Sequence, residues 1–249
     1  MVTLHLLGTG AALSDASRTT TMLAVEGPGS LYLVDCGGDA AHRALNSGLE
    51  LERVSGLIVT HEHADHVGGF PLLMERLWLA GHTDPFPVYG NEAALKQIER
   101  LDGAFDTSAW PDYPALDLFL VPELERELVL TCEEFTIYAS PSQHAVPCIG
   151  LRVETSDGKV LAYSSDTEPS AAITRLAEGA DLLVHEATGK GPGHTGPADA
   201  ARVALEAGAK RLVLVHIGPK DDGGAATLAE AQAVFPNTEL GADGGRYEF

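Results

Sequence analysis

The sequence predicts an α/β fold in which β-sheets pack between helices. Short apolar runs rich in β-branched residues alternate with helical patterns through much of the chain. Some runs follow one another as hairpins and others are separated by helices, an order that favours sheets covered by helices. No low-complexity linker or internal repeat interrupts the pattern, and 45% of the 249 residues are hydrophobic, enough to form a core. We therefore expect one domain over residues 1–249.

The predicted strands are short apolar runs bounded by Gly, Asp or Pro. Their β-branched content and their length both favour strands over buried helix segments. In chain order they are Thr3–Leu7, Thr21–Val25, Leu31–Asp35, Gly56–Thr60, Phe135–Ala139, Ile149–Glu154, Val160–Ser164, Leu182–His185 and Leu212–His216.

The predicted helices carry apolar residues at helical spacing. The clearest is Pro197–Ala207, because Pro197 suits a first helical turn and Gly208 can end the helix. The Pro-rich segments Thr83–Pro87 and Trp110–Pro114 are predicted to be loops or inserts. The other predicted helices are Asp39–Ser47, Val67–Leu79, Glu92–Leu101 and Pro169–Glu178.

The charge of the chain argues against a nucleic-acid polymer as its default partner. There are 16 Lys and Arg residues against 36 Asp and Glu residues, a formal net charge of −20. Polynucleotides are bound mainly by positive side chains that displace counterions, and an acidic surface repels them at long range.

Cysteine usage and the N-terminus favour a cytoplasmic location. Three cysteines are too few, and odd in number, for a disulfide framework, and we expect Cys36 and Cys148 to be buried thiols. The N-terminus lacks the basic region of a signal peptide. No stretch approaches the roughly 18 apolar residues of a membrane span. We expect a cytoplasmic protein with no membrane partner.

The strongest functional signal is the cluster His-Glu-His-Ala-Asp-His at residues 61–66, directly after an apolar run. In an extended segment alternate residues point the same way, so His61 and His63 can bind one ion. Asp65 and His66 can face a second ion about 3.5–4 Å away, the separation that two-metal hydrolases use. These ligands suit zinc, with manganese or iron as alternatives. A solvated polar turn rarely contains three His and an Asp.

Two metal ions need further ligands, and three polar residues occur where they can supply them. His144, Asp166 and His216 each follow a predicted strand. Binding groups tend to gather at the carboxyl ends of strands in α/β sheets. Any one of them alone would be read as a surface residue, but together they predict a two-metal site.

These motifs resemble those of the metallo-β-lactamase superfamily in order and spacing. The resemblance implies an αββα sandwich, two mixed β-sheets flanked by helices, with a di-zinc centre at one edge. By that analogy one metal is held by His61, His63 and His144, the other by Asp65, His66 and His216, and Asp166 bridges the two.

Within the superfamily the chain most resembles the ribonuclease Z branch, which processes tRNA 3′ ends. The opening motifs Leu-Leu-Gly-Thr-Gly at 6–10 and Leu-Val-Asp-Cys-Gly at 33–37 match, as does His-Glu-Ala-Thr at 185–188 followed by Gly-His-Thr at 193–195. The resemblance implies a dyad in which Glu186 orients His194 as the proton donor to the leaving alkoxide. It also implies a homodimer.

The chemistry expected from such a site is hydrolysis. Two divalent ions lower the pKa of a bridging water toward neutrality and neutralise charge on a phosphoryl or carbonyl oxygen. Asp65 or Asp166 can hold the proton of the resulting hydroxide in a hydrogen bond and so direct its lone pair. We therefore expect Asp65, Glu186 and His194 to be catalytic.

Two features depart from the ribonuclease branch. Its members usually carry a long Gly/Pro-rich arm that clasps tRNA, but only 21 residues separate His144 from Asp166, and a predicted hairpin turning at Ser156-Asp157-Gly158 uses them all. Residues 38–40 read Gly-Asp-Ala, where the tRNA enzymes typically have a Glu-Gly-Thr type of sequence.

The sequence thus favours a di-zinc phosphodiesterase that acts on a small or cyclic phosphodiester. The alternatives are a tRNA 3′-processing endonuclease whose clasp comes from another source, such as a dimer partner, and a lactonase or thioesterase using the same metals. A non-enzymatic binding module is disfavoured because every expected ligand is present.

Overall fold

Two seven-stranded mixed sheets form the centre of the molecule. The computed structural model describes residues 1–220 and 223–249. The first sheet has the order β14-β1-β2-β3-β4-β5-β6, antiparallel from β14 to β3 and parallel from β3 to β6. Its strands are β1 (Thr3–Gly8), β2 (Met22–Glu26), β3 (Leu31–Val34), β4 (Val54–Val59), β5 (Phe86–Gly90), β6 (Leu116–Leu120) and β14 (Gly245–Glu248).

The second sheet has the order β13-β12-β11-β10-β9-β8-β7. Strands β10 to β13 run parallel, whereas β7 to β10 pair antiparallel. Its strands are β7 (Glu127–Thr131), β8 (Phe135–Pro141), β9 (Ile149–Thr155), β10 (Val160–Tyr163), β11 (Leu182–Glu186), β12 (Leu212–Val215) and β13 (Thr238–Leu240).

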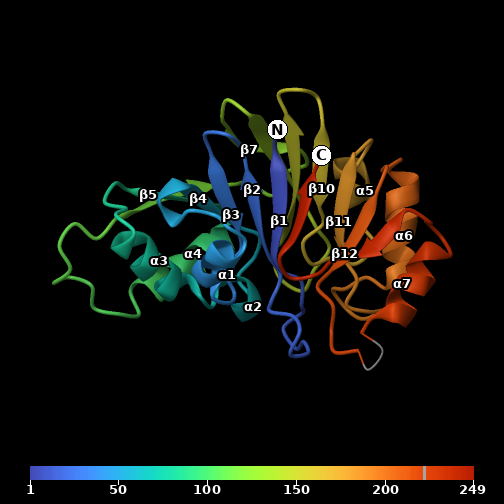
Figure 1. Ribbon diagram of the computed structural model, residues 1–249, viewed down its shortest axis with the longest axis horizontal. Coiled ribbons are helices and arrows are strands. Elements are labelled where there is room, and N and C mark those ends of the chain that lie inside the picture. Colours follow the sequence, from blue (N-terminus) through green and yellow to red (C-terminus); the bar gives the residue numbers. More distant parts are fainter. Residues whose placement is uncertain (221–222) are drawn as a thin grey trace.

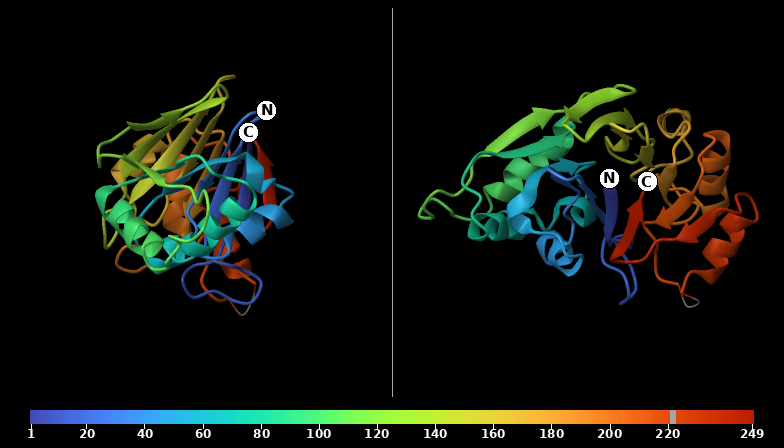
Figure 2. Two further views of the ribbon diagram at one scale, coloured as in Figure 1. Left: turned by 90° about the vertical axis from the view of Figure 1, so that its left-hand side faces the viewer. Right: turned by 45° about the horizontal axis from the view of Figure 1, so that its top comes forward.

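Helices cover the outer face of each sheet, which makes four layers (Figures 1 and 2). One apolar cluster lies between the sheets, with Leu4 and Ile58 from the first and Ile137 and Val184 from the second. Two further clusters lie between each sheet and its helices. The helices are α1 (Ala40–Asn46), α2 (Ala64–Val67), α3 (Phe70–Leu79), α4 (Glu92–Asp102), α5 (Ala171–Leu176), α6 (Pro197–Glu206) and α7 (Ala225–Gln232), with a short 3₁₀ turn at Leu51–Arg53.

The predicted αββα sandwich is therefore confirmed, and all nine predicted strands form within one or two residues of their expected bounds. The prediction of one helix over Val67–Leu79 is wrong, because the chain forms α2 and then restarts as α3. The break falls at Gly68 and Gly69. A side chain at Gly69 would place its Cβ 2.0 Å from the carbonyl oxygen of Gly38, so glycine is required where these segments cross.

The prediction that Thr83–Pro87 is a loop also needs correction, because β5 begins at Phe86. Phe86 is buried under the helices of the first sheet, and Pro87 is tolerated because it lies near the start of the strand. Strands β6, β7, β13 and β14 and helix α7 were not predicted. Strand β6 has mostly exposed side chains and β13 only three residues, so neither has a strong apolar signal.

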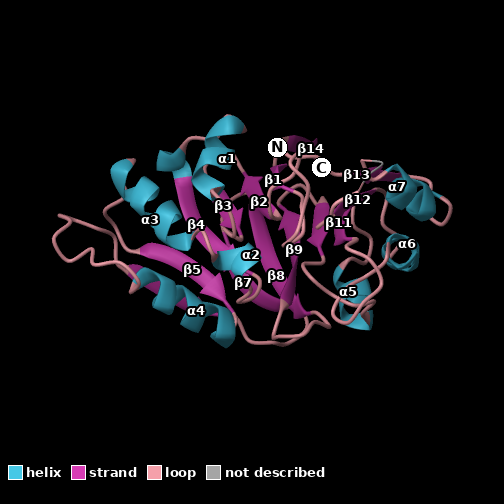
Figure 3. Ribbon diagram, turned by 90° about the horizontal axis from the view of Figure 1, so that it is seen from below, coloured by secondary structure: helices cyan, strands magenta, loops and turns pink. Residues whose placement is uncertain are grey.

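The strands that precede the predicted ligands all end at one edge of the sandwich. Strands β10, β11 and β12 run parallel in one sheet, and β4 ends opposite them in the other. Seen from below, α2 lies in the middle of the molecule, between the ends of the two sheets (Figure 3). No helix among the described residues has the length and apolar character needed to cross a bilayer.

Candidate metal centre and its surroundings

The His-Glu-His-Ala-Asp-His segment leaves the end of β4 and turns into α2. His63 is the N-cap of α2 and has an extended backbone, while His61 and His66 are fully buried. The neighbouring loop packs tightly against this turn: the amide of Cys36 donates to the carbonyl of His66, and a Cβ at Gly37 would lie 1.7 Å from the carbonyl oxygen of Asp65. These contacts with the segment that follows β3 fix the position of the turn.

Four side chains form a first candidate half-site: His61, His63, His144 and Asp166. Nδ1 of His63 lies 3.1 Å from Nε2 of His61 and 3.2 Å from Nε2 of His144. Oδ2 of Asp166 lies 3.8 Å from Nε2 of both His61 and His144. The ligand atoms of four residues from three separate parts of the chain thus lie close to one another.

A second half-site is formed by Asp65, His66 and His216. Oδ2 of Asp65 lies 3.6 Å from Nε2 of His66 and 3.4 Å from Nε2 of His216. The other oxygen of Asp166, Oδ1, lies 3.6 and 3.4 Å from the same two nitrogens. Asp166 therefore directs one carboxylate oxygen at each half-site.

The donor atoms and their spacing fit divalent cations. Tetrahedral zinc ligands about 2.0–2.1 Å from the ion lie about 3.3 Å from one another, close to the distances in both half-sites. Nε2 of His66 and Oδ1 of Asp166 are also buried without any hydrogen-bond partner among the described residues. Buried polar atoms normally have a hydrogen-bond partner, so the lack of one at both atoms is consistent with their binding a cation.

The second ring nitrogen of each buried histidine is fixed by an outer oxygen. Nδ1 of His66 donates to Asp35 at 2.8 Å, and Nδ1 of His144 to the carbonyl oxygen of Gly193 at 2.8 Å. Nδ1 of His216 lies 2.6 Å from the hydroxyl of Thr188. Such contacts select the tautomer that leaves Nε2 free as a ligand.

Asp35 contacts the candidate site through His66, and the sequence did not single it out as a site residue. It is fully buried, and it accepts from the amide and hydroxyl of Thr60 as well as from His66. Its backbone has a positive φ of 61°, which is uncommon for a non-glycine residue. The available signal was a carboxylate at the end of an apolar strand, the same signal that identified Asp166.

Burial and charge act in opposite directions on the histidines. Desolvation lowers the pKa of His61 well below its usual value, and the neighbouring imidazoles add to this effect. Desolvation also disfavours charge on His66, but Asp166, Asp35 and Asp65 overcome it and raise the pKa of His66 to about 9. Positive charge is therefore favoured at His66, beside the carboxylates, and disfavoured at His61.

Glu186 and His194 lie beside the cluster, as the sequence analysis expected. Nδ1 of His194 is 3.0 Å from Oε1 of Glu186, and the hydrogen bond raises the pKa of His194 against the opposing effect of desolvation. Glu186 is fully buried and accepts from the amides of Thr167, Thr188 and Thr195, which fix its position. The His194 ring stacks on the His216 ring at 5.6 Å between centroids.

His194 opens into a cavity of about 400 Å³ that is also lined by Glu168 and Lys190. The His194 side chain is 27% exposed, in contrast to the buried histidines of the cluster. One ring nitrogen of His194 is occupied by Glu186, and a ring nitrogen lies within 4.8 Å of the ligand atoms of Asp166 and His216. A molecule in this cavity can therefore contact His194, which itself lies beside two residues of the candidate metal centre.

Comparison with known proteins gives consistent matches. A family model described as "Beta-lactamase superfamily domain" matches residues 31–217. The chain is 28% identical to ribonuclease BN of Erwinia tasmaniensis over 96% of this chain and 97% of the relative. It is 29% identical to ribonuclease Z of Geobacillus kaustophilus over 95% of each.

Among solved structures, the metallo-β-lactamase fold protein YhfI from Bacillus subtilis is similar over 100% of both chains. Its TM-score is 0.83 and its sequence identity is 24%. This neighbour agrees with the four-layer architecture described above.

Proposed function

We propose that this chain, which belongs to the β-lactamase superfamily and is a metal-dependent hydrolase of ester bonds, is a phosphodiesterase. Its proposed substrate is a small or cyclic phosphodiester. The observation that carries this choice is the short connection between His144 and Asp166. Strands β9 and β10 pair antiparallel through a turn of residues 156–159. A tRNA-clasping arm of the ribonuclease Z type has no place there.

The relatives support the same point. The alignment with ribonuclease BN extends over 302 positions, more than the 249 residues of this chain, so the relative contains segments without a counterpart here. The net charge of −20 also disfavours a long polyanion across the outer surface.

We assign His61, His63 and His144 to one divalent ion and Asp65, His66 and His216 to the other, with Asp166 between them. Imidazole nitrogens and carboxylate oxygens in this number suit two zinc ions. The contacts from Asp35, Gly193 and Thr188 to the outer ring nitrogens support this assignment.

When bound, two such ions would acidify a water molecule and neutralise charge on a phosphoryl oxygen. We assign the acceptance of a proton from that water to the carboxylate of Asp65, because both oxygens of Asp166 are already directed at the two half-sites. Glu186 holds one nitrogen of His194, so the other can donate a proton to the departing alkoxide. The cavity beside His194 gives the leaving group a way out.

A second candidate is tRNA 3′ processing with the clasp supplied from elsewhere, for instance by a second subunit. The observation that favours it is the match to proteins named ribonuclease BN and ribonuclease Z over almost the whole chain. The metal centre would serve both reactions equally, so only the substrate distinguishes them.

The deciding experiment is a substrate panel with the zinc- or manganese-loaded protein: bis(p-nitrophenyl) phosphate, cyclic nucleotides, acyl lactones and a tRNA precursor. We expect turnover of the first two classes. Cleavage of the tRNA precursor at a far higher kcat/KM would favour the second candidate. Turnover confined to lactones would contradict both.

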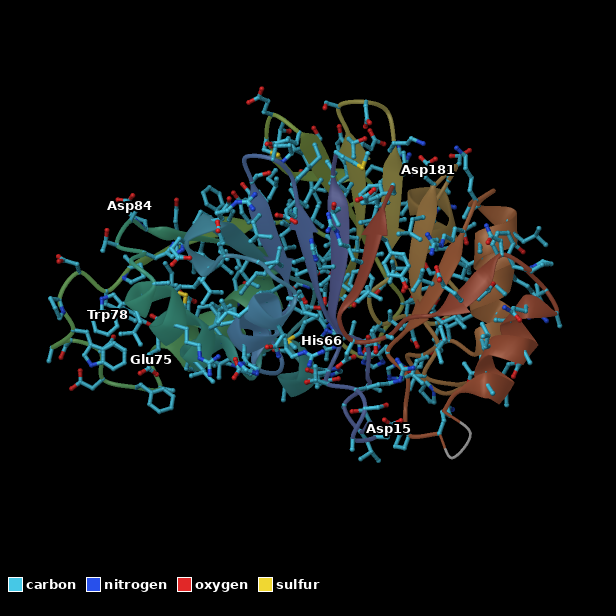
Figure 4. The ribbon with its side chains drawn as sticks, viewed as in Figure 1. Asp15, His66, Glu75, Trp78, Asp84 and Asp181 are labelled. Carbon is cyan, nitrogen blue, oxygen red and sulfur yellow. The ribbon has the colours of Figure 1, made fainter. Side chains whose placement is uncertain are left out.

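The metal assignment is tested by elemental analysis after dialysis against dilute zinc. Asp166→Asn should retain less zinc than the unaltered protein, because one half-site would face a neutral amide oxygen and the other an amide NH2 group that does not bind zinc. The matched control is Asp181→Asn, at the opposite edge of the molecule from His66 (Figure 4). Full metal content in Asp166→Asn would contradict the bridging role.

A further inference from the structure

A second cavity, of about 360 Å³, lies between the first half of α3 and the segment 103–115 that joins α4 to β6. Its volume is within the range of small-molecule sites. Glu75 and Trp78, both on α3, lie toward one end of the molecule, well to the side of His66 (Figure 4). This cavity shares no lining residue with the one beside His194.

Aromatic side chains that pack against one another form one wall of this cavity. Trp110 and Tyr113 line it, with their rings in an edge-to-face arrangement at 5.6 Å between centroids. Trp78 stacks behind Trp110 at 4.8 Å, and its Nε1 donates to the carbonyl oxygen of Pro111 at 2.9 Å. These contacts fix the positions of the aromatic rings without a ligand. Trp110 and Tyr113 belong to a loop, whereas Trp78 belongs to α3.

The polar part of the lining is acidic. Glu75, Asp102 and Asp106 contribute carboxylates, and none of the described residues lining the cavity is basic. Oδ1 of Asp102 is shielded from solvent and has no hydrogen-bond partner among the described residues. A shielded carboxylate oxygen without a partner is costly, and a cation in the cavity near the Asp102 carboxylate would reduce that cost.

The pKa shifts of the residues that line the cavity agree with its acidic, partly buried character. Burial raises the pKa of Asp102. Burial also raises the pKa of Tyr113 to about 12, with further contributions from the charges of Asp102 and Glu75. Both shifts are in the direction expected for a partly buried cavity in which additional negative charge is disfavoured.

We propose that this cavity binds a small organic cation, an ammonium or quaternary ammonium group on an apolar body. The faces of Trp110 and Tyr113 attract such a group through their π-electrons, and the carboxylates supply the opposite charge. A hydrated metal ion would gain little from the aromatic wall, and an anion would be repelled by Glu75, Asp102 and Asp106.

The test uses intrinsic fluorescence, because Trp78 and Trp110 are the chain's two tryptophans and both belong to this wall. Choline serves as the probe, and its uncharged carbon isostere, dimethylbutanol, tests the need for charge. We expect a saturable change in emission with choline and none with dimethylbutanol at the same concentration.

Variants test the acidic residues. Asp102→Asn should weaken choline binding about tenfold. Glu75→Gln provides a second test should Asp102→Asn fail to fold. The matched control is Asp84→Asn, an acid near the same end of the molecule that does not line this cavity, and it should bind choline unchanged. Phosphodiester turnover should be the same in all of these variants.

Three results would overturn the proposal. One is equal binding of choline and dimethylbutanol, which would indicate a plain apolar pocket. Another is unchanged choline affinity in both Asp102→Asn and Glu75→Gln. The third is tryptophan emission that changes on dilution without a probe, together with a dimer that Trp110→Leu abolishes, which would show that a second copy covers the cavity.

Discussion

The Glu186–His194 pair has geometry that a proton donor requires. The carboxylate is buried and fixed by three backbone amides, while the imidazole is partly exposed beside the candidate metal centre. A buried anion stabilises the protonated ring, and the exposed side of the ring can meet a substrate.

We expect His194→Ala to lower kcat for diesters with poor leaving groups by about 10²–10⁴-fold, the usual contribution of a general acid. Bis(p-nitrophenyl) phosphate should be affected far less, because p-nitrophenolate leaves without a proton. Steady-state rates on the two substrates at equal zinc content measure the difference. Equal losses on both would remove the proton-donor role.

Glu186→Gln should change the pH profile. Glu186 raises the pKa of His194, and His194 donates only while it is protonated, so activity falls as pH rises through that pKa. Removing the charge lowers the pKa of His194. The alkaline limb of kcat/KM should therefore move to lower pH, and an unmoved limb would contradict the pairing.

Individual residues differed in how well the sequence identified them. His61, His63, Asp65 and His66 form a local motif, and His144, Asp166 and His216 follow strong apolar runs. Asp35 and Thr188 act by orienting His66 and His216 across long sequence separations. No spacing rule links such outer contacts to their partners, so only the folded structure reveals them.

At the scale of secondary structure, the N-terminus of α4 supports the candidate site. The side chain of Asn91 caps α4 by accepting from the amide of Ala94. Its amide group donates to the carbonyl oxygen of Pro147 at 2.9 Å and to that of Thr60 at 3.4 Å. One fully buried side chain thus links the start of α4 to the segments that precede His61 and Ile149.

Asn91→Ala should lower the free energy of unfolding by about 1–3 kcal/mol, because it removes the helix cap and the hydrogen bonds that this buried side chain donates to Pro147 and Thr60. Urea denaturation in the presence of a chelator measures this without a contribution from metal binding. Asn46→Ala, at an exposed position at the end of α1, is the control and should change stability by less than about 0.5 kcal/mol. Equal effects would mean that the Asn91 contacts contribute nothing specific.

Elements with a continuous apolar signal were predicted, and elements stabilised mainly by their neighbours were not. Strand β12 is fully buried, and its apolar sequence predicted it. Strand β6 has mostly exposed side chains and forms by pairing with β5 at the edge of the sheet. The break between α2 and α3 comes from contact with Gly38, a constraint that helical periodicity does not contain.

At the scale of the whole molecule, both sheets share one apolar layer, and β14 at the C-terminus pairs with β1 at the N-terminus. We propose on this basis that residues 1–249 form one domain. The sandwich could be predicted because the order and spacing of the His and Asp motifs resemble those of a known family. The pairing of β14 could not, because it joins two distant short segments.

The overall charge leads to a prediction about tRNA. With a net charge of −20 and no arm at the β9–β10 turn, the His194→Ala protein should bind a tRNA precursor with a Kd weaker than about 10⁻⁴ M, the weak end of non-specific polynucleotide binding. Filter binding at physiological salt, the condition to which this limit applies, is the measurement. Micromolar binding that weakens as salt is added would contradict the small-substrate proposal.

Asp35, Ser165 and His216 have positive φ angles, which lower the stability of the fold, but their side chains are needed at or near the candidate site. Each of these residues follows a strand and adopts a backbone conformation that glycine tolerates better. Glycine there would ease the backbone but delete a side chain that contacts the cluster or its surroundings. Selection for heat resistance alone would favour glycine at these positions, whereas selection for turnover would oppose it.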